Sequence, residues 1–318
     1  MKCTTCDSDK TKKFGKDRKG NQRFRCLACG KTFDAQERIE GKNLPIDKAL
    51  LVLQLLVEGN SVRSTERITG IHRDTILRLL VTVGEHCETL MAELIRDVPV
   101  SEVQADEIWC FVEMKEKTKK RNGKGEDETI GDAYTFVAIE RTTKLVLAFH
   151  LGRRTNADTQ IFTDKLDDAT SGHFQINTDG FVPYREAIVG TLGNRVDFAQ
   201  IVKIFGTPEG DERRYSPPEV IEMRKTAVHG QPNMDTATTA HVERQNLTMR
   251  MSMRRFTRLT NGFSKKWVNL YAMLCLHYAH YNFCRVHQTL RVTPAMEAGL
   301  TNHIWSLKEM LNWHSNTN

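Results

Sequence analysis

The sequence predicts a mixed α/β protein in which a larger domain follows two small N-terminal modules. Three observations support this: paired cysteines near the N-terminus, helical periodicity over residues 46–95, and a change to β-rich segments from Val100 onward. At 318 residues the chain is long enough for two or three domains, and the largest can bury a sizeable core. We therefore expect domains over residues 1–42, 43–97 and 98–318.

The positive charge of the chain is concentrated at its start. Residues 1–45 hold 12 basic and 6 acidic side chains, a surplus as large as the net charge of +6 of the whole chain. A small basic module favours a polyanionic partner such as nucleic acid, with solvated lysines on an ordinary surface as the alternative. The sequence shows neither an apolar signal segment nor a membrane-spanning stretch, so we expect a cytoplasmic protein that binds no membrane.

Four cysteines have the spacing of a metal site. Cys3 and Cys6 form one Cys-x-x-Cys pair, Cys26 and Cys29 form another, and 19 residues separate the pairs. This spacing predicts a zinc ribbon, in which four thiolates close one structural Zn²⁺ site without an open position for chemistry. The arm between the pairs carries basic residues at Lys10, Lys12, Lys13, Lys16, Arg18, Lys19, Arg23 and Arg25. They suit phosphate contact, while a ribbon that serves only folding or dimerisation is the alternative.

Residues 46–95 predict a helix-turn-helix module. Apolar residues recur at helical spacing over 46–57, a short helix follows the N-cap Ser61, and Gly70 makes the turn into a third helix. This order is used to place a recognition helix in the major groove of DNA. The exposed reading residues of that helix would be His72, Arg73, Thr75 and Arg78. A three-helix bundle without DNA contact has the same apolar pattern and is the alternative.

From Val100 the pattern changes to strands. We predict strands over 103–114, 134–139, 145–151 and 173–179, with a helix between the third and the fourth. Thr155 and Asp158 resemble a capping box at the start of that helix, which gives Asp158 a structural role. Residues 115–128 are interpreted as a charged, solvated loop. Three antiparallel strands, a crossover helix and a further strand form the order of a ribonuclease-H-like sheet.

Three acidic residues occur in settings that suggest metal-dependent chemistry. Asp106 lies in the first predicted strand, Asp179 at the end of the fourth, and Glu243 on a helix predicted from about Thr236. Cutting a phosphodiester with hard divalent cations requires a carboxylate cluster that holds two ions about 3.5–4 Å apart. Period-two alternation does not choose between Asp106 and the adjacent Glu107, because both faces of that strand are apolar.

The helix of Glu243 also carries arginines. Helical spacing places Glu243 on one side with Leu247, Arg250, Arg254 and Arg258. An acid on such a face can hold a metal ion while the arginines bind the phosphates that are cut. A glutamate that pairs with arginines on a solvated helix is the alternative, and it is favoured when this segment is considered alone. The basic residues assigned to DNA here are Arg244, Arg250, Arg254, Arg255 and Arg258.

These motifs resemble those of the insertion-sequence-1 family of transposases. The resemblance covers the cysteine pairs, the helix-turn-helix, ADEIW around Asp106, NTDG around Asp179, HVERQNLTMRMSMRRFTRLTNGFSKK from His241 and YNFCRVHQTLRVTPAMEAGL from Tyr281. It implies a ribonuclease-H-like core of the retroviral-integrase type and an Asp-Asp-Glu triad of Asp106, Asp179 and Glu243. It also favours Asp106 over Glu107. In the best-known members two reading frames are joined, whereas one frame encodes both parts here.

The resemblance implies a transposase that binds the terminal inverted repeats of its own element in the nucleoid of a bacterium or archaeon. Two Mg²⁺ or Mn²⁺ ions at the triad would serve cleavage and strand transfer to target DNA. Because two ends must be held together, a homodimer or larger assembly is expected. The alternatives are a domesticated DNA-binding regulator, which the intact triad disfavours, and a ribonuclease-H-like nuclease without strand transfer, which the two N-terminal modules disfavour.

Three C-terminal histidines, His277, His280 and His287, have two interpretations. They suggest a metal site, but residues 268–281 have the composition of an aromatic-rich packing helix. We therefore favour satisfied or exposed histidines over metal ligands.

Overall fold

The computed structural model describes residues 1–3, 5–18, 20, 22–34, 44–206, 220–257 and 260–314. These residues form two compact units, Met1–Val52 and Leu53–Asn318. Lys19, Arg258 and the expected domain boundary between residues 42 and 43 lie outside the described residues.

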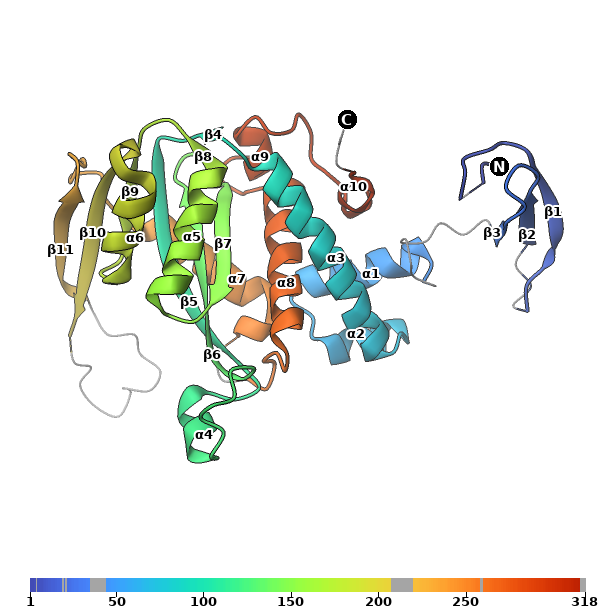
Figure 1. The fold of residues 1–318 in the computed structure, drawn as a ribbon, viewed down its shortest axis with the longest axis horizontal. Helices are drawn as coiled ribbons and strands as arrows, with labels where there is room; N and C mark the ends of the chain where they lie inside the picture. Colours follow the sequence, from blue (N-terminus) through green and yellow to red (C-terminus); the bar gives the residue numbers. More distant parts are fainter. Residues whose placement is uncertain are drawn as a thin grey trace. The chain divides into compact units, whose positions relative to one another are not determined.

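The first unit contains a three-stranded antiparallel sheet (Figure 1). Its strands are β1 (Thr11–Lys16), β2 (Gln22–Cys26) and β3 (Thr32–Asp34). Within the described residues of this sheet, the rings of Phe24 and Phe33 stack at 6.0 Å, and Arg23 and Arg25 lie over Phe14. A three-stranded sheet of this size is too small to be stabilised by burial alone.

The second unit is built on a six-stranded mixed sheet of order β11-β10-β9-β5-β6-β7 (Figure 1). Its strands are β5 (Glu102–Val112), β6 (Gly131–Glu140), β7 (Val146–Gly152), β9 (Phe174–Thr178), β10 (Val196–Phe205) and β11 (Val220–His229). Strands β5, β6 and β7 are antiparallel neighbours. Strand β9 runs parallel to both β5 and β10, and β11 is antiparallel to β10. The parallel strands β5, β9 and β10 thus form the centre of the sheet, and antiparallel strands flank them on both sides.

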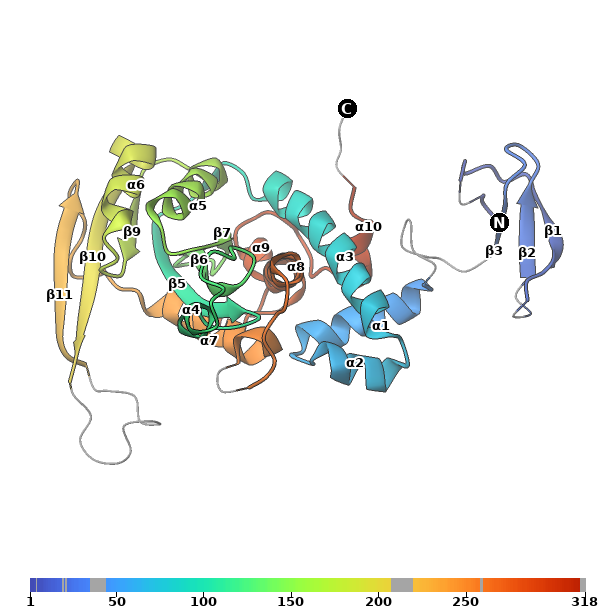
Figure 2. The same ribbon diagram turned by 60° about the horizontal axis from the view of Figure 1, so that its bottom comes forward.

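Helices cover both faces of this sheet (Figures 1 and 2). The main covering helices are α5 (Asn156–Ala169), α6 (Pro183–Leu192), α7 (Ala240–Ser252) and α8 (Trp267–Ala279). On one face Phe136 of β6 packs against Phe162 of α5 and Tyr184 of α6, with ring centroids 5.6 and 6.3 Å apart. On the other face Phe149 of β7 packs against Tyr278 of α8 at 4.8 Å. Burial on both faces explains why the strand sequences lack a polar side.

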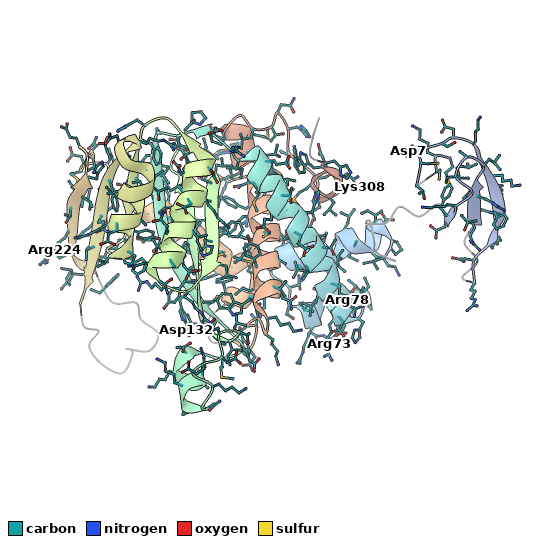
Figure 3. All side chains as sticks on the ribbon, viewed as in Figure 1. Asp7, Arg73, Arg78, Asp132, Arg224 and Lys308 are labelled. Carbon is teal, nitrogen blue, oxygen red and sulfur yellow. The ribbon has the colours of Figure 1, made fainter. Side chains whose placement is uncertain are left out.

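The helical segment before the sheet has the predicted order. It consists of α1 (Ile46–Val57), α2 (Val62–Thr69) and α3 (Arg73–Leu94). The Oγ of Ser61 accepts a hydrogen bond from the amide of Ser64 at 3.0 Å, and Gly70 ends α2 with φ of 68°. Helix α3 lies in the second unit and packs along α8. The four candidate reading residues at its start are exposed, and Figure 3 labels two of them, Arg73 and Arg78.

The remaining elements are short. They are β4 (Val98–Pro99), α4 (Glu116–Arg121), β8 (Thr170–Ser171), the turns Gly193–Arg195 and Arg254–Phe256, the π-helix His280–Cys284, α9 (Pro294–Glu297) and α10 (Leu307–Asn312). Among the described helices none is long and apolar enough to cross a membrane.

Some sequence predictions were wrong in detail. The solvated loop expected over 115–128 contains the helix α4, where the buried Lys119 lies 3.5 Å from Glu116. The helix expected from Thr236 begins at Ala240 and ends at Ser252, so Arg254 lies in a separate turn and not on the helix face. The cap expected at Thr155 was confirmed, since its Oγ1 accepts a hydrogen bond from the amide of Asp158 at 3.1 Å, while the carboxylate of Asp158 accepts from the amide of Arg153 at 3.0 Å.

His277 is neither exposed nor satisfied, contrary to our expectation. Its side chain is 2% exposed in α8, and within the described ranges neither ring nitrogen has a hydrogen-bond partner. Burial lowers the pKa of His277 to about 3, because an imidazolium ion is poorly solvated there.

We expect His277→Leu to weaken the destabilising effect of acid. His277 takes up a proton below about pH 6.5 in the unfolded chain but stays neutral down to about pH 3 in the folded one. The free energy of unfolding therefore falls as the pH is lowered from about 6.5 to about 3. Between about pH 7.5 and pH 5 the variant should lose about 2 kcal/mol less free energy of unfolding than the wild type. Urea titrations measure this, with the exposed His314→Leu as control; equal losses would contradict the prediction.

Candidate functional site

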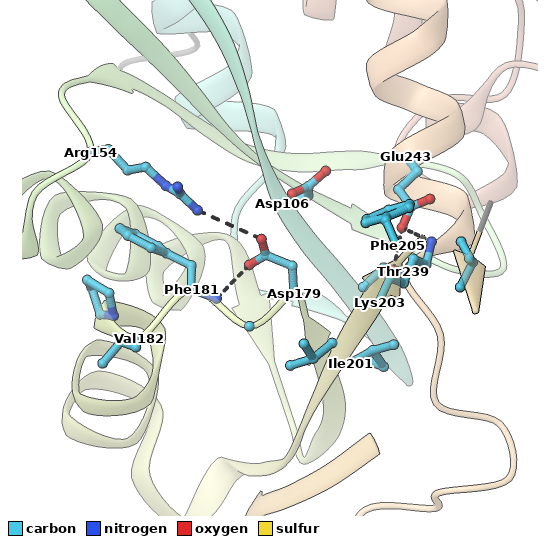
Figure 4. A pocket seen from close by; sticks show the side chains of 14 residues that line it. Asp106, Arg154, Asp179, Phe181, Val182, Ile201, Lys203, Phe205, Thr239 and Glu243 are labelled. Carbon is cyan, nitrogen blue, oxygen red and sulfur yellow. Dashed lines mark hydrogen bonds and ion pairs between the residues drawn. The ribbon is translucent and has the colours of Figure 1, made fainter. Parts of the chain in front are cut away.

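A cleft of about 740 Å³ opens beside the C-terminal ends of β9 and β10 (Figure 4). Its walls come from β5, the segment after β9, β10 and the start of α7. The charged and polar residues that line it are Asp106, Arg154, Asp179, Lys203, Thr239 and Glu243. All three acids of the predicted triad therefore face one cleft.

Asp106 and Glu107 lie on opposite faces of β5. On the α7 side, the Nδ2 of Asn246 donates a hydrogen bond to Asp106 Oδ2 at 2.8 Å. On the α6 side, Tyr184 Oη and Arg154 Nε donate to Glu107 at 3.1 and 2.6 Å. Asp106 lines the cleft, whereas Glu107 is held by two protein partners and does not line it. The helices that cover the two faces thus give the two acids different partners, a distinction that the periodicity of the sequence could not make.

The turn that carries Asp179 is tightly held. Asp179 Oδ1 accepts a hydrogen bond from the amide of Phe181 at 3.0 Å. The Nε2 of Gln200 in β10 donates to the carbonyls of Asp179 and Phe181 at 3.0 and 3.2 Å. A Cβ on Gly180 would lie 2.7 Å from a methyl group of Val202, so a larger residue here would require the side chain of Val202 to move. The neighbouring strand therefore fixes where the carboxylate of Asp179 stands.

Three carboxylates form a compact group. Asp106, Glu107 and Asp179 each offer an oxygen within 4.8 Å of the others, a grouping that can hold a metal ion. Burial, followed by the charge of Asp179, raises the pKa of both Asp106 and Glu107 to about 7. Burial also raises the pKa of Asp179. The group therefore carries more negative charge than its surroundings balance.

Arg154 is the cation closest to this group among the cleft residues. Its Nη2 lies 3.9 Å from Asp179 Oδ2, and its guanidinium carbon lies 4.2 Å from the ring centroid of Phe181. The positive charge of Arg154 lowers the pKa of Glu107 and of Asp179 against the opposing effect of burial. Stacking on Phe181 keeps the guanidinium in place.

Glu243 reaches the cleft from the first turn of α7. Its Oε1 accepts a hydrogen bond from Thr239 Oγ1 at 2.6 Å and forms an ion pair with Lys203 of β10. Helix α7 begins where Gln104 of β5 accepts hydrogen bonds from two amides of its first turn, those of His241 and Val242, at 2.8 and 3.3 Å. The compact carboxylate group, as found among the described residues, does not include Glu243.

In the first unit the four cysteines meet. Cys3 Sγ lies 3.7 Å from Cys29 Sγ, and Cys6 Sγ lies 3.6 Å from Cys26 Sγ. All four sulfurs lie within 4.8 Å of one another, which makes them a second group that can hold a metal ion. The amides of Cys29 and Ala28 donate hydrogen bonds to the sulfur of Cys26 at 3.5 and 3.4 Å. These bonds, that of Cys29 most, lower the pKa of the Cys26 thiol to about 6. A lowered pKa favours the thiolate form that binds metals.

The arginines assigned to DNA do not form a single row. Arg244 and Arg254 are exposed, while Arg250 is half-buried. Arg255 is also half-buried, and its Nε donates to Ser264 Oγ at 2.8 Å. Sequence reasoning also missed Arg154 and Asn246. Asn246 follows Glu243 by three residues, a helical spacing that could have placed the two side chains together.

The described residues thus form a mixed sheet with a carboxylate group beside a cleft, and separately a four-cysteine group; each group can hold a metal ion. No protein-family model matches the chain. Over 78 residues, 24% of its length, it is 31% identical to the insertion element iso-IS1N protein InsA of Shigella dysenteriae, and the match covers 84% of that protein. The chain therefore belongs to the family of this InsA protein.

The chain is also similar, at low identity, to solved structures. Among them is the cryo-EM structure of the piggyBac transposase synaptic complex with hairpin DNA, with a TM-score of 0.37 and 11% identity. The similarity covers 85% of this chain and 70% of that one.

We expect Asp106→Asn to stabilise the metal-free protein at about pH 8 and to change little near pH 4. The pKa of Asp106 is raised from 3.8 to about 7 on folding, so ionisation costs the fold stability as pH rises through that window. The midpoint of thermal unfolding at about pH 8 should rise by roughly 5 °C. The exposed Asp235→Asn is the control. A lower midpoint for Asp106→Asn at that pH would contradict the prediction that ionisation of Asp106 destabilises the fold.

Proposed function

We propose that the protein is an insertion-sequence transposase that cleaves the ends of its own element and joins them to target DNA. The observation that carries this proposal is the cleft in which Asp106, Asp179 and Glu243 converge from two strands and a helix. Membership in the family of an insertion-element protein supports the same assignment.

We assign the second unit a ribonuclease-H-like core. The antiparallel strands β5, β6 and β7, the crossover helix α5 and the parallel strand β9 beside β5 support this topology. The proposed domains are a zinc ribbon over 1–42, a helix-turn-helix over 43–97 and the catalytic domain over 98–318.

The donor atoms in the cleft suit hard divalent cations. They are carboxylate oxygens, which Mg²⁺ and Mn²⁺ prefer, and burial raises the pKa values of Asp106 and Asp179, an effect that a bound cation would oppose. Asp106, Asp179 and Glu243 would hold the ions. When bound, two such ions polarise the phosphate and lower the pKa of the attacking water or 3′-hydroxyl.

The chain's own residues prepare the cleft for a phosphate. Asn246 orients Asp106 through a hydrogen bond, and the Gln200 contacts hold the turn of Asp179. Arg154 balances part of the charge of Glu107 and Asp179. Lys203 neutralises Glu243 and brings a positive charge to the cleft wall, where it suits an entering DNA phosphate.

The N-terminal modules would select the DNA. We propose that the four cysteines hold a structural Zn²⁺ ion and that α3 reads the terminal inverted repeats with His72, Arg73, Thr75 and Arg78. The exposed Arg244 and Arg254 would contact phosphates. Because two ends must be held together, the active form would be a homodimer or larger assembly.

We expect Asp106→Asn to abolish Mg²⁺-dependent nicking while DNA binding is retained. Loss of an ion ligand removes several kcal/mol of transition-state stabilisation, so nicking should fall by at least about a thousandfold. The assay uses duplexes from the two ends of the surrounding element, with the exposed Glu222→Gln as control. Nicking that survives in Asp106→Asn would sink the assignment, and wild-type protein that binds these ends without nicking would instead be a regulator.

We expect a zinc chelator to expose the four N-terminal thiols. Because metal binding would supply much of the folding free energy of the first unit, Cys3, Cys6, Cys26 and Cys29 should react with an alkylating reagent only after chelation. Mass spectrometry of the labelled peptides measures this, and the buried Cys87 and Cys275 serve as internal controls. Equal labelling before and after chelation, or a metal content far below about one zinc per chain, would refute the zinc site.

A further inference from the structure

A second cleft, of about 730 Å³, lies between the helix-turn-helix and the segment after α7. One wall is formed by the starts of α2 and α3, and the other by residues 254–255 and 261–269. Its basic lining residues are Arg63, Arg73, Arg254, Arg255 and Lys265, and among the described lining residues Asp74 is the one acid. We call this cleft the basic groove.

The cations of the basic groove are available to a ligand. Arg63, Arg73, Arg254 and Lys265 are exposed, and no carboxylate in the described part of the chain forms an ion pair with any of them. Asp74 lies 3.6 Å from the ring of His72. Because few carboxylates neutralise the cations on the two walls, the groove has a positive potential that attracts a polyanion.

Both walls are attached to elements that carry the candidate triad. The turn between α1 and α2 approaches the end of α7 so closely that a Cβ on Gly59 would lie 3.2 Å from the carbonyl oxygen of Met251. On the other wall, the carbonyl of Ser264 accepts a hydrogen bond from the amide of Glu113, just after β5, at 2.8 Å. Ser264 also bridges to Val112 of β5. The groove is therefore fixed relative to the strand of Asp106 and the helix of Glu243.

The groove and the cleft lie at opposite ends of α7. Glu243 is in the first turn of the helix, and Arg254 follows its last residue, Ser252. At 1.5 Å per residue, the helix between Glu243 and Ser252 is about 14 Å long. This is less than half of one turn of duplex DNA, which rises about 34 Å. A single duplex can thus span both.

We propose that the basic groove binds the sugar–phosphate backbone of the same DNA duplex whose end enters the cleft. The choice of DNA as the polyanion rests on the proposed function. Cations on both walls suit the negative oxygens along one strand, and Asn261 and Asn269 add neutral hydrogen-bonding groups. The groove couples end recognition to cleavage, because one duplex contacts the helix-turn-helix and the catalytic elements together.

The test compares two double variants of the full-length protein with equal loss of charge. Arg63→Gln with Lys265→Gln removes one cation from each wall. Arg67→Gln with Lys266→Gln removes exposed cations from the same two segments, but these residues do not line the groove. Binding of a fluorescent duplex of about three helical turns is measured by anisotropy across a salt series.

The groove variant should bind on the order of tenfold more weakly at moderate salt, with the slope of log K against log salt reduced by about 1.8. The matched control should keep the wild-type slope, and the charge-retaining pair Arg63→Lys with Lys265→Arg should restore most of the binding. An unchanged slope in the groove variant, equal loss in the control, or equal competition by single-stranded DNA would overturn the proposal.

Failure of the groove and failure of the proposed function give different results. If the wild type nicks element ends with Mg²⁺ but the groove variant binds normally, the function stands and the groove proposal is wrong. If the groove variant loses duplex binding but the wild type never nicks, the groove stands and the transposase assignment is wrong. Wild-type protein that binds no duplex would overturn both.

Discussion

The position of α7 on the sheet depends on one buried side chain, Gln104. The first amides of a helix have no partner within the helix, and leaving them buried and unpaired costs roughly 1–3 kcal/mol each. Gln104 accepts hydrogen bonds from two of them, those of His241 and Val242. This contact sets the start of α7, and with it the height of Glu243 above the cleft and the contact between Asn246 and Asp106.

Local sequence signals predicted the elements that are governed locally. Turn residues and periodicity indicated the caps at Ser61 and Thr155 and the longer elements α1, α2, α3, β5, β6, β7, α5 and β9, but not the short helix α4. The start of α7 could not be predicted, since Gln104 is 137 residues from His241 in the sequence. Strands β10 and β11 were also missed. The roles of Arg154 and Lys203 could not be predicted either, because these residues lie beside the acids only in the folded sheet.

Charge balance links the two clefts of the second unit. The first gathers carboxylates beyond what Arg154 and Lys203 neutralise, and the second gathers cations around a single aspartate. A ligand that carries both phosphate charge and divalent counterions satisfies the two together, whereas a neutral ligand satisfies neither. The fold therefore places an excess of negative charge at one end of the short helix α7 and an excess of positive charge at the other.

The adjacent acids of β5 have a consequence for how this chain tolerates change. Side chains alternate between the two faces of a strand, so a slip of one residue in the pairing of β5 would turn Asp106 away from the face that α7 covers. A slip in one direction would bring Glu107, with its longer side chain, to the position of Asp106, and a slip in the other direction would bring Ala105 there. Insertions and deletions in this strand thus act in whole steps, and each odd step turns Asp106 away from the cleft.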